Sequence, residues 1–312
     1  MDNLILSINV VLPLFMCIAL GYFLRCIRLI EDAAQKSLNK LCFRVFLPIH
    51  LFSSVFTTDL SAAFNPKLMA FALLGVLSLF AVLMLWIPRI EPENAKRGVM
   101  IQAIFRSNFV LFGLPVASSL CGEQHIGPTS LLIGFVVPLF NVLAVICLET
   151  FRGGKPNVSK ILRGIITNPL IIASVLGVIL NLLHLPLPSG VMKGISDLGR
   201  VATPLSLVAL GAGFQFDRLR GCLRQLILCV TGKLVLCPLV MISLGTLLGF
   251  RGETLVPILA LFGSPIAVSS YTMAEQMDGD GVLAASLVVL TTAFSIVTMF
   301  LFIFGLKQLG LI

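Results

Sequence analysis

The motif LFGxP occurs twice in this sequence, at 111–115 and at 261–265, each time inside a long apolar run. Its proline lacks a backbone N–H and clashes with the preceding helical turn, while its glycine relaxes the backbone. Each motif therefore predicts a helix that breaks near its middle. Two broken apolar helices at corresponding places in two halves of a chain are typical of the binding site of a secondary transporter.

The chemistry that such breaks offer is anion binding. A second half-helix is predicted to begin beside each proline, near Val116 and near Ile266, because proline suits the first helical position. The free N–H groups and the positive dipole end of a helix N-terminus attract anions. Two converging ends predict a site for a small anion such as a carboxylate. A kink that only shapes packing is the alternative for a single motif.

Side chains near the breaks could complete this site. The Asn108 amide, two helical turns before Pro115, can donate to a carboxylate, although an interhelical hydrogen bond would also explain it. Arg44 could attract anions from within the second apolar run, Lys233 lies inside another run, and Arg106 and Arg200 are interpreted as residues that snorkel from span ends. The candidate substrate-binding residues are Arg44, Ser107, Asn108, Gly113, Pro115, Val116, Gly263, Ser264, Pro265, Ile266 and Ser269.

Other site chemistries find little support in the sequence. No nucleophile–base pair or carboxylate dyad stands out, so an enzyme is not expected. His50, His125 and His184 are far apart and the eight cysteines form no C-x-x-C pair, so neither a metal nor another cofactor is expected. The acidic cluster Glu275 to Asp280 could couple transport to protons or cations, but a solvated turn is the preferred interpretation.

Composition places these elements in a membrane. Hydrophobic residues make up 58% of the 312 residues and charged residues only 12%, against about 25% charged residues in soluble proteins. The mean hydropathy is +1.06. An integral membrane protein in contact with a lipid bilayer is therefore expected. The net charge of +8 does not indicate a nucleic-acid partner, because the basic residues lie in the gaps between apolar runs.

About ten apolar runs are long enough to cross the roughly 30 Å of hydrocarbon as helices. Sequence matches relate the two halves: Pro13-Leu14 corresponds to Pro169-Leu170, and Arg44-Val45 corresponds to Arg200-Val201. The runs lie near 4–24, 37–57, 67–88, 99–121, 127–149, 168–184, 199–216, 225–248, 254–275 and 282–306.

An odd number of spans per half predicts that the second half enters the membrane with the opposite orientation. The predicted fold is therefore an all-α membrane protein with a five-plus-five inverted repeat. Its fourth and ninth spans are the proline-broken crossover helices. The first repeat covers 1–151, a cytoplasmic connector covers 152–167, and the second repeat covers 168–312.

Lysine and arginine in the gaps predict the orientation. The gaps after the first, third, fifth and seventh spans carry thirteen of them and the opposite side carries four. The side with the larger number is cytoplasmic, so both termini are expected to be extracytoplasmic. The thirteen are Arg25, Arg28, Lys36, Arg89, Lys96, Arg97, Arg152, Lys155, Lys160, Arg163, Arg218, Arg220 and Arg224, and the four are Lys67, Lys193, Arg251 and Lys307.

At these residues the chain resembles the auxin efflux carrier family, which includes plant PIN-formed carriers and bacterial malate and malonate permeases. The resemblance covers essentially the whole chain, and its most specific parts are N-x-x-x-x-G-x-P at 108–115 and NKLCFRVFLP at 39–48. It implies ten spans, a scaffold part and a mobile transport part, with crossover prolines at Pro115 and Pro265 and the family's conserved asparagine at Asn108. Unlike many plant carriers, this chain has a short gap after its fifth span and no acidic residue between Leu68 and Trp86.

Together these observations predict that the protein is a secondary active or facilitative transporter of small organic anions. Its expected location is a cell membrane, typically the bacterial inner membrane. Its substrates would be malate-like, malonate-like or auxin-like carboxylates, moved by elevator-type alternating access. A sodium-coupled symporter with the fold of the bile-acid symporters and a membrane receptor are the alternatives. The sequence leaves open whether the chain forms a homodimer and whether protons or sodium drive transport.

Overall fold

The computed structural model describes residues 2–58, 65–122, 125–153, 158–183, 185–215 and 221–312. All regular elements in these ranges are helices, which confirms the all-helical class. Lys155, His184, Arg218 and Arg220, together with part of the expected connector 152–167, lie outside the described residues.

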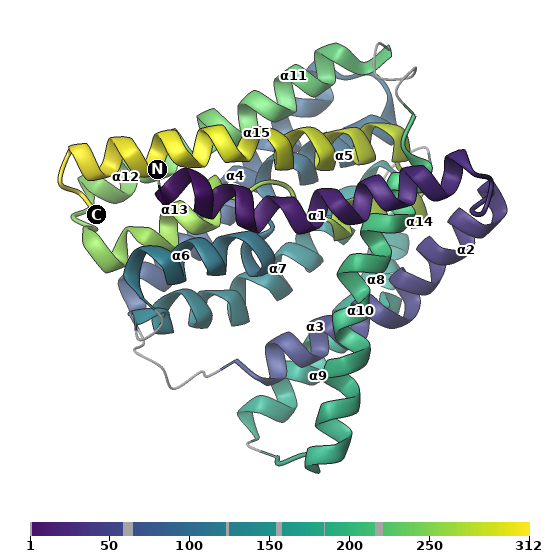
Figure 1. Ribbon diagram of the computed structural model, residues 1–312, viewed down its shortest axis with the longest axis horizontal. Helices are drawn as coiled ribbons and strands as arrows, with labels where there is room; N and C mark the ends of the chain where they lie inside the picture. The colour runs from purple at the N-terminus through teal and green to yellow at the C-terminus, as the bar shows by residue number, and fades with distance from the viewer. Residues whose placement is uncertain (1, 59–64, 123–124, 154–157, 184, 216–220) are drawn as a thin grey trace.

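The helices follow one another along the chain with short connections, and Figure 1 shows their arrangement. The first half contains α1 (Asp2–Cys26), α2 (Asp32–Leu41), η1 (Cys42–Phe46), α3 (Leu47–Phe56), α4 (Pro66–Ile90), α5 (Asn94–Phe105), η2 (Phe109–Gly113), α6 (Leu114–Cys121) and α7 (Gly127–Phe151). The second half contains α8 (Val158–Thr167), α9 (Pro169–Leu182), α10 (Ser189–Gly213), α11 (Leu223–Thr231), η5 (Gly232–Leu236), α12 (Cys237–Leu247), η6 (Gly252–Thr254), α13 (Val256–Gly263), α14 (Ser269–Gln276) and α15 (Gly281–Gln308).

Five of the described helical segments are long and apolar enough to cross a membrane. Three of them are single helices, α4, α7 and α15. The other two are the segment 94–121, formed by α5, η2 and α6, and the segment 223–247, formed by α11, η5 and α12. Shorter apolar helices cover Val11–Cys26, Pro169–Leu182 and Gly252–Gly263. These elements lie in the expected apolar runs, while the count of ten spans stays a prediction.

Three helices continue through a proline by means of a π-helical turn. The turns η1, η2 and η5 each end two residues before a proline, which is Pro48, Pro115 or Pro238. A proline deprives the carbonyl one turn earlier of its donor, and a wider turn is one way in which a helix absorbs that loss. The break expected at Gly113 and Pro115 is therefore not observed, because the helix runs without interruption from Phe109 to Cys121.

The helix breaks lie at residues 106–108 and 264–268. The first separates α5 from η2, so it precedes Pro115 by about two turns. The second separates α13 from α14 and contains Pro265, as expected. Ser264 has φ −65° and ψ 148°, the extended backbone that a following proline favours, so α13 ends at Gly263.

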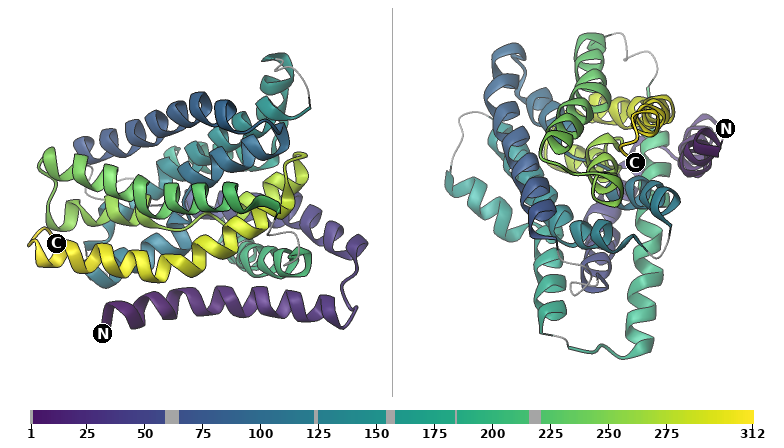
Figure 2. Two further views of the ribbon diagram at one scale, coloured as in Figure 1. Left: turned by 90° about the horizontal axis from the view of Figure 1, so that it is seen from above. Right: turned by 90° about the vertical axis from the view of Figure 1, so that its left-hand side faces the viewer.

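The helices form two groups, which we call the scaffold group (α1, α2, η1, α3, α9 and α10) and the core group (α4–α7 and α11–α15 with their π turns). In the scaffold group, α1 packs on α10 and α3 packs on α9 and α10. Figure 1 shows α3, α9 and α10 projecting from the rest, and Figure 2 shows α1 running beside α15. Each half of the chain contributes its first helices to the scaffold group and its later helices to the core group.

Two close helix contacts in the scaffold group correspond to each other between the halves. Gly21 of α1 lies against the carbonyl of Val208 in α10, where a Cβ would overlap the oxygen. Gly177 of α9 lies against the carbonyl of Phe52 in α3, at 3.0 Å from the position of a Cβ. Gly21 precedes Gly177 by about 156 residues, and Phe52 precedes Val208 by the same offset. The inverted repeat itself stays a prediction.

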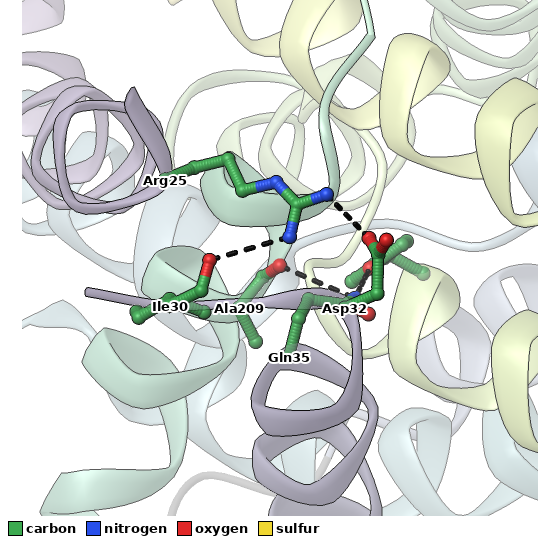
Figure 3. Close-up of polar contacts among 6 residues, drawn as sticks. Arg25, Ile30, Asp32, Gln35 and Ala209 are labelled. Atoms are coloured by element: carbon green, nitrogen blue, oxygen red, sulfur yellow. Dashed lines mark hydrogen bonds and ion pairs between the residues drawn. The ribbon is translucent and has the colours of Figure 1, made fainter. Parts of the chain in front are cut away.

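The scaffold group meets α14 of the core group at a buried polar contact. Gln35 of α2 donates through Nε2 to Tyr271 Oη at 2.5 Å. The same Nε2 donates to the Ala209 carbonyl of α10 at 3.4 Å (Figure 3). Nearby, Arg25 at the end of α1 pairs with Asp32 at 2.5 Å and fixes the turn between α1 and α2. The side chains of Gln35 and Tyr271 are both almost fully buried.

Candidate anion-binding site at the two helix breaks

The two helix breaks touch each other. The Asn108 N–H donates to the Pro265 carbonyl at 2.7 Å. Beside this contact is a cavity of about 60 Å³, enough for a few water molecules. The scaffold group lines one side of the cavity and the breaks with α7 line the other. Its lining residues are Leu47, His50, Leu51, Arg106, Ser107, Asn108, Phe109, Val110, Leu111, Val137, Phe140, Thr203, Ser206, Ala267, Val268 and Ser269.

Arg106 brings a buried positive charge to this cavity. Its guanidinium donates to Asn141 Oδ1 at 2.7 Å and to Ser269 Oγ at 2.8 Å, and it contacts the Met273 sulfur at 2.7 Å. The residue is only 3% exposed. The expectation that Arg106 snorkels is therefore wrong. It follows a helix that begins at Asn94, so it lies about 18 Å along that segment and far from its end.

A second buried cation, Lys233, contacts the first helix break. Lys233 of η5 is fully buried, and its Nζ donates to Ser107 Oγ. Neither Lys233 nor Arg106 forms an ion pair with a carboxylate in the part of the chain that the structure describes. Buried charge without a counter-ion is costly, and an anion that enters beside both groups would lower that cost.

Asn108 supplies an unused hydrogen-bond donor. It is the residue that precedes η2, and its side chain makes no capping bond to that helix. Its Nδ2 is buried and has no hydrogen-bond partner among the described residues. Because Asn108 lines the cavity, this amide can donate to a bound molecule without breaking a contact within the protein.

The helix N-terminus at the first break begins at Phe109, not near Val116. Phe109, Val110 and Leu111 form its first turn and all line the cavity. At the second break α14 begins at Ser269, and the Ile266 N–H already donates to Thr291 Oγ1 at 3.3 Å. The first break therefore turns a helix N-terminus toward the cavity, whereas the N–H expected at Ile266 is occupied.

The other sequence-predicted residues divide by location. Ser107, Asn108 and Ser269 line the cavity, whereas Gly113, Pro115, Val116, Gly263, Ser264, Pro265 and Ile266 do not. The first three lie in the helix that follows the first break, and the other four lie at the second break. A Cβ on Gly113 would lie 2.9 Å from the Ala260 carbonyl and 3.1 Å from Ser264 Oγ, so glycine allows the two interrupted helices to approach.

Arg44 of η1 lines a larger crevice of about 890 Å³. It precedes Leu47, which lines the cavity, by about one helical turn. Arg163 shares this crevice, and both side chains are exposed. Arg152 also lies there, paired with Glu149 at 2.9 Å and with Asp278 at 2.7 Å. The crevice lies where the scaffold group meets the ends of α7 and α14.

Sequence reasoning missed Arg106, His50 and Asn141 as residues of this site. Arg106 and Asn141 are a charged and an amide residue inside apolar runs, and such residues are functional candidates by default. That signal was present in the sequence, but the depth of Arg106 depends on where α5 begins. His50 carried no sequence signal beyond its residue type.

A cavity with polar and apolar walls, between helices apolar enough to cross a membrane, is typical of a membrane transporter. A model of the family described as "Membrane transport protein" matches residues 6–303. The chain therefore belongs to this family, the auxin efflux carriers, as its motifs indicated. Proteins of this family are transporters, not enzymes.

Two archaeal proteins illustrate the relationship. The chain is 26% identical over 296 residues to an "Uncharacterized transporter" of Methanothermobacter thermautotrophicus, an alignment that covers 94% of this chain and 96% of that protein. It is 23% identical over 304 residues to another "Uncharacterized transporter", of Methanocaldococcus jannaschii, with 93% and 96% covered.

Proposed function

We propose that this protein is a secondary carrier of small organic anions, carboxylates above all. The observation that carries the proposal is Arg106, a buried guanidinium at the contact of two helix breaks with no carboxylate partner among the described residues. Arginine binds carboxylates through two parallel hydrogen bonds, so it suits this substrate class better than a lysine would.

The rest of the cavity suits the same kind of molecule. Asn108 Nδ2 and the first turn of η2 can donate to the carboxylate oxygens. Val137 and Phe140 of α7, with Leu47 and Leu51 of α3, offer an apolar wall to a short carbon skeleton. A cavity of about 60 Å³ holds only a small solute, so binding would be accompanied by some separation of the two helix groups.

Alternating access would arise from movement of the core group against the scaffold group. The cavity and the 890 Å³ crevice both lie between these groups, and Arg44 and Arg163 give the crevice a positive potential. In this proposal the chain has ten spans in two inverted repeats, 1–151 and 168–312, in a cell membrane. Its crevice side is cytoplasmic and both termini are extracytoplasmic. A reporter fused to the C-terminus tests this topology, and a cytoplasmic reading would contradict it.

The function is tested by uptake of labelled lactate, malonate, malate and indoleacetate into vesicles that contain the purified protein. Accumulation of at least one carboxylate, with an organic cation excluded, is the expected result. Binding without accumulation would indicate a receptor. Uptake that requires a sodium gradient would indicate a sodium-coupled symporter. Preference for the cation over every carboxylate would exclude the anion assignment.

A further inference from the structure

We propose that His50 binds a proton together with the transported anion, so that this carrier couples anion movement to protons. The inference rests on the proposed function and names its coupling ion. The neutral imidazole takes a proton from the water on one side of the membrane and becomes imidazolium while the anion is bound. It releases the proton to water on the other side when the anion leaves.

The position of His50 is the first observation. It lies on α3 of the scaffold group and lines the cavity that Arg106, Ser107 and Asn108 line from the core group. Helix α10 holds its backbone in place, because a Cβ on Gly199 would lie 3.2 Å from the His50 Cα. His50 from the scaffold group and Arg106 from the core group therefore line the same small cavity.

The lack of a fixed partner is the second observation. Within the described ranges the His50 ring has no hydrogen bond or ion pair. Thr203 and Ser206 of α10, Val137 and Phe140 of α7, and Ser269 of α14 line the cavity near it, and none of them is charged. The protonation of the ring can therefore respond to a molecule that binds in the cavity.

The charged groups around His50 favour this coupling. Arg106 is the charged residue that shares the cavity, and no carboxylate lines it among the described residues. On α10, Asp197 and Arg200 pair at 3.9 Å with their side chains exposed, and Arg44 of η1 is exposed in the crevice. On α9, the helix that packs on α3, the residues from Pro169 to Leu182 include no titratable group.

Electrostatics then couples the binding of the proton to the binding of the anion. In the empty cavity a second positive charge beside Arg106 is unfavourable, because like charges repel and neither is in bulk water. A carboxylate between the two groups reverses this preference and stabilises the imidazolium. Each ligand must therefore raise the affinity for the other by the same factor. Histidine suits the role because its ordinary titration range lies near neutral pH.

The experiment measures proton uptake when lactate or oxalate binds to the purified protein in a weakly buffered solution with a pH indicator. Both probes are fully ionised between about pH 6 and about pH 8, so a proton taken up is bound by the protein. We expect about one proton per bound anion at the upper end of this range. The dissociation constant should rise up to about tenfold per pH unit there.

Two variants locate the proton. His50→Gln is expected to bind the probe with no proton uptake and a flat pH profile, and His50→Asn provides a second neutral replacement. His125→Gln is the matched control, because that exposed histidine pairs with Glu253 at 2.9 Å and does not line the cavity. It is expected to behave like the unmodified protein.

The outcomes separate the two proposals. If the unmodified protein binds a probe with no proton uptake, proton coupling is excluded while anion transport stands. The same conclusion follows if His50→Gln keeps the full proton uptake. If no carboxylate binds at all, the proposed function fails and the coupling fails with it.

Discussion

The Asn108 N–H and the Pro265 carbonyl join the two helix breaks at 2.7 Å. Each break on its own exposes backbone groups that cannot stay unpaired inside a membrane protein. The contact satisfies one donor and one acceptor at once, and it fixes the Asn108 side chain beside the cavity. It also makes the geometry of the site depend on both halves of the chain.

Replacing Arg106 by glutamine is expected to weaken carboxylate binding about ten- to a hundredfold, because a hydrogen bond to a charged group contributes roughly 1.5–3 kcal/mol. Binding is measured by the thermal shift of purified protein on addition of each carboxylate. Arg200→Gln is the matched control, since Arg200 is exposed and outside the cavity. Equal affinities of the Arg106 variant and the control would remove Arg106 from the binding site.

Asn108→Ala is expected to reduce transport strongly while the fold persists. The amide Nδ2 has no partner in the described protein, so its removal breaks no side-chain bond there, but a bound carboxylate loses a donor. The expected loss of affinity is about tenfold or more. Vesicle uptake and the unfolding temperature are measured together. A variant that transports normally would show that Asn108 only positions the break through its backbone.

Lys233→Met is expected to separate stability from binding. Lys233 is fully buried and pairs with no carboxylate in the ranges that the structure describes, so an apolar side chain of similar length is expected to maintain or raise the unfolding temperature. Anion affinity is expected to fall at the same time, because the site loses a nearby positive charge. Lys67→Met serves as the control, because Lys67 donates to the Leu248 carbonyl at an exposed position. A large loss of stability without loss of affinity would argue for a purely structural lysine.

Gly21→Ala is expected to destabilise the protein by about 1–3 kcal/mol, because the new Cβ would overlap the Val208 carbonyl and force α1 away from α10. Gly190→Ala is the control, since open space surrounds that position. Thermal unfolding in detergent measures both changes. A Gly21→Ala protein as stable as the control would mean that the two helices can separate at little cost.

Local sequence determined the helical class and one of the two breaks. The proline at 265 disfavours helical backbone at Ser264, and this rule acts between neighbours, so α13 ends where the sequence predicts. The long apolar runs likewise required helices, because a membrane leaves backbone groups no other partners. The second LFGxP motif could therefore be interpreted directly.

Tertiary structure decided the first break and the composition of the cavity. Pro115 follows the same local rule, but a π turn absorbs its missing donor, and packing of Gly113 against Ala260 and Ser264 holds that helix in place. The break lies instead at residues 106–108, where Pro265 accepts from the Asn108 N–H, Ser269 accepts from Arg106, and Lys233 donates to Ser107. Those partners are remote in sequence, so only the folded chain could show that Arg106 is buried and that His50 lines the same cavity.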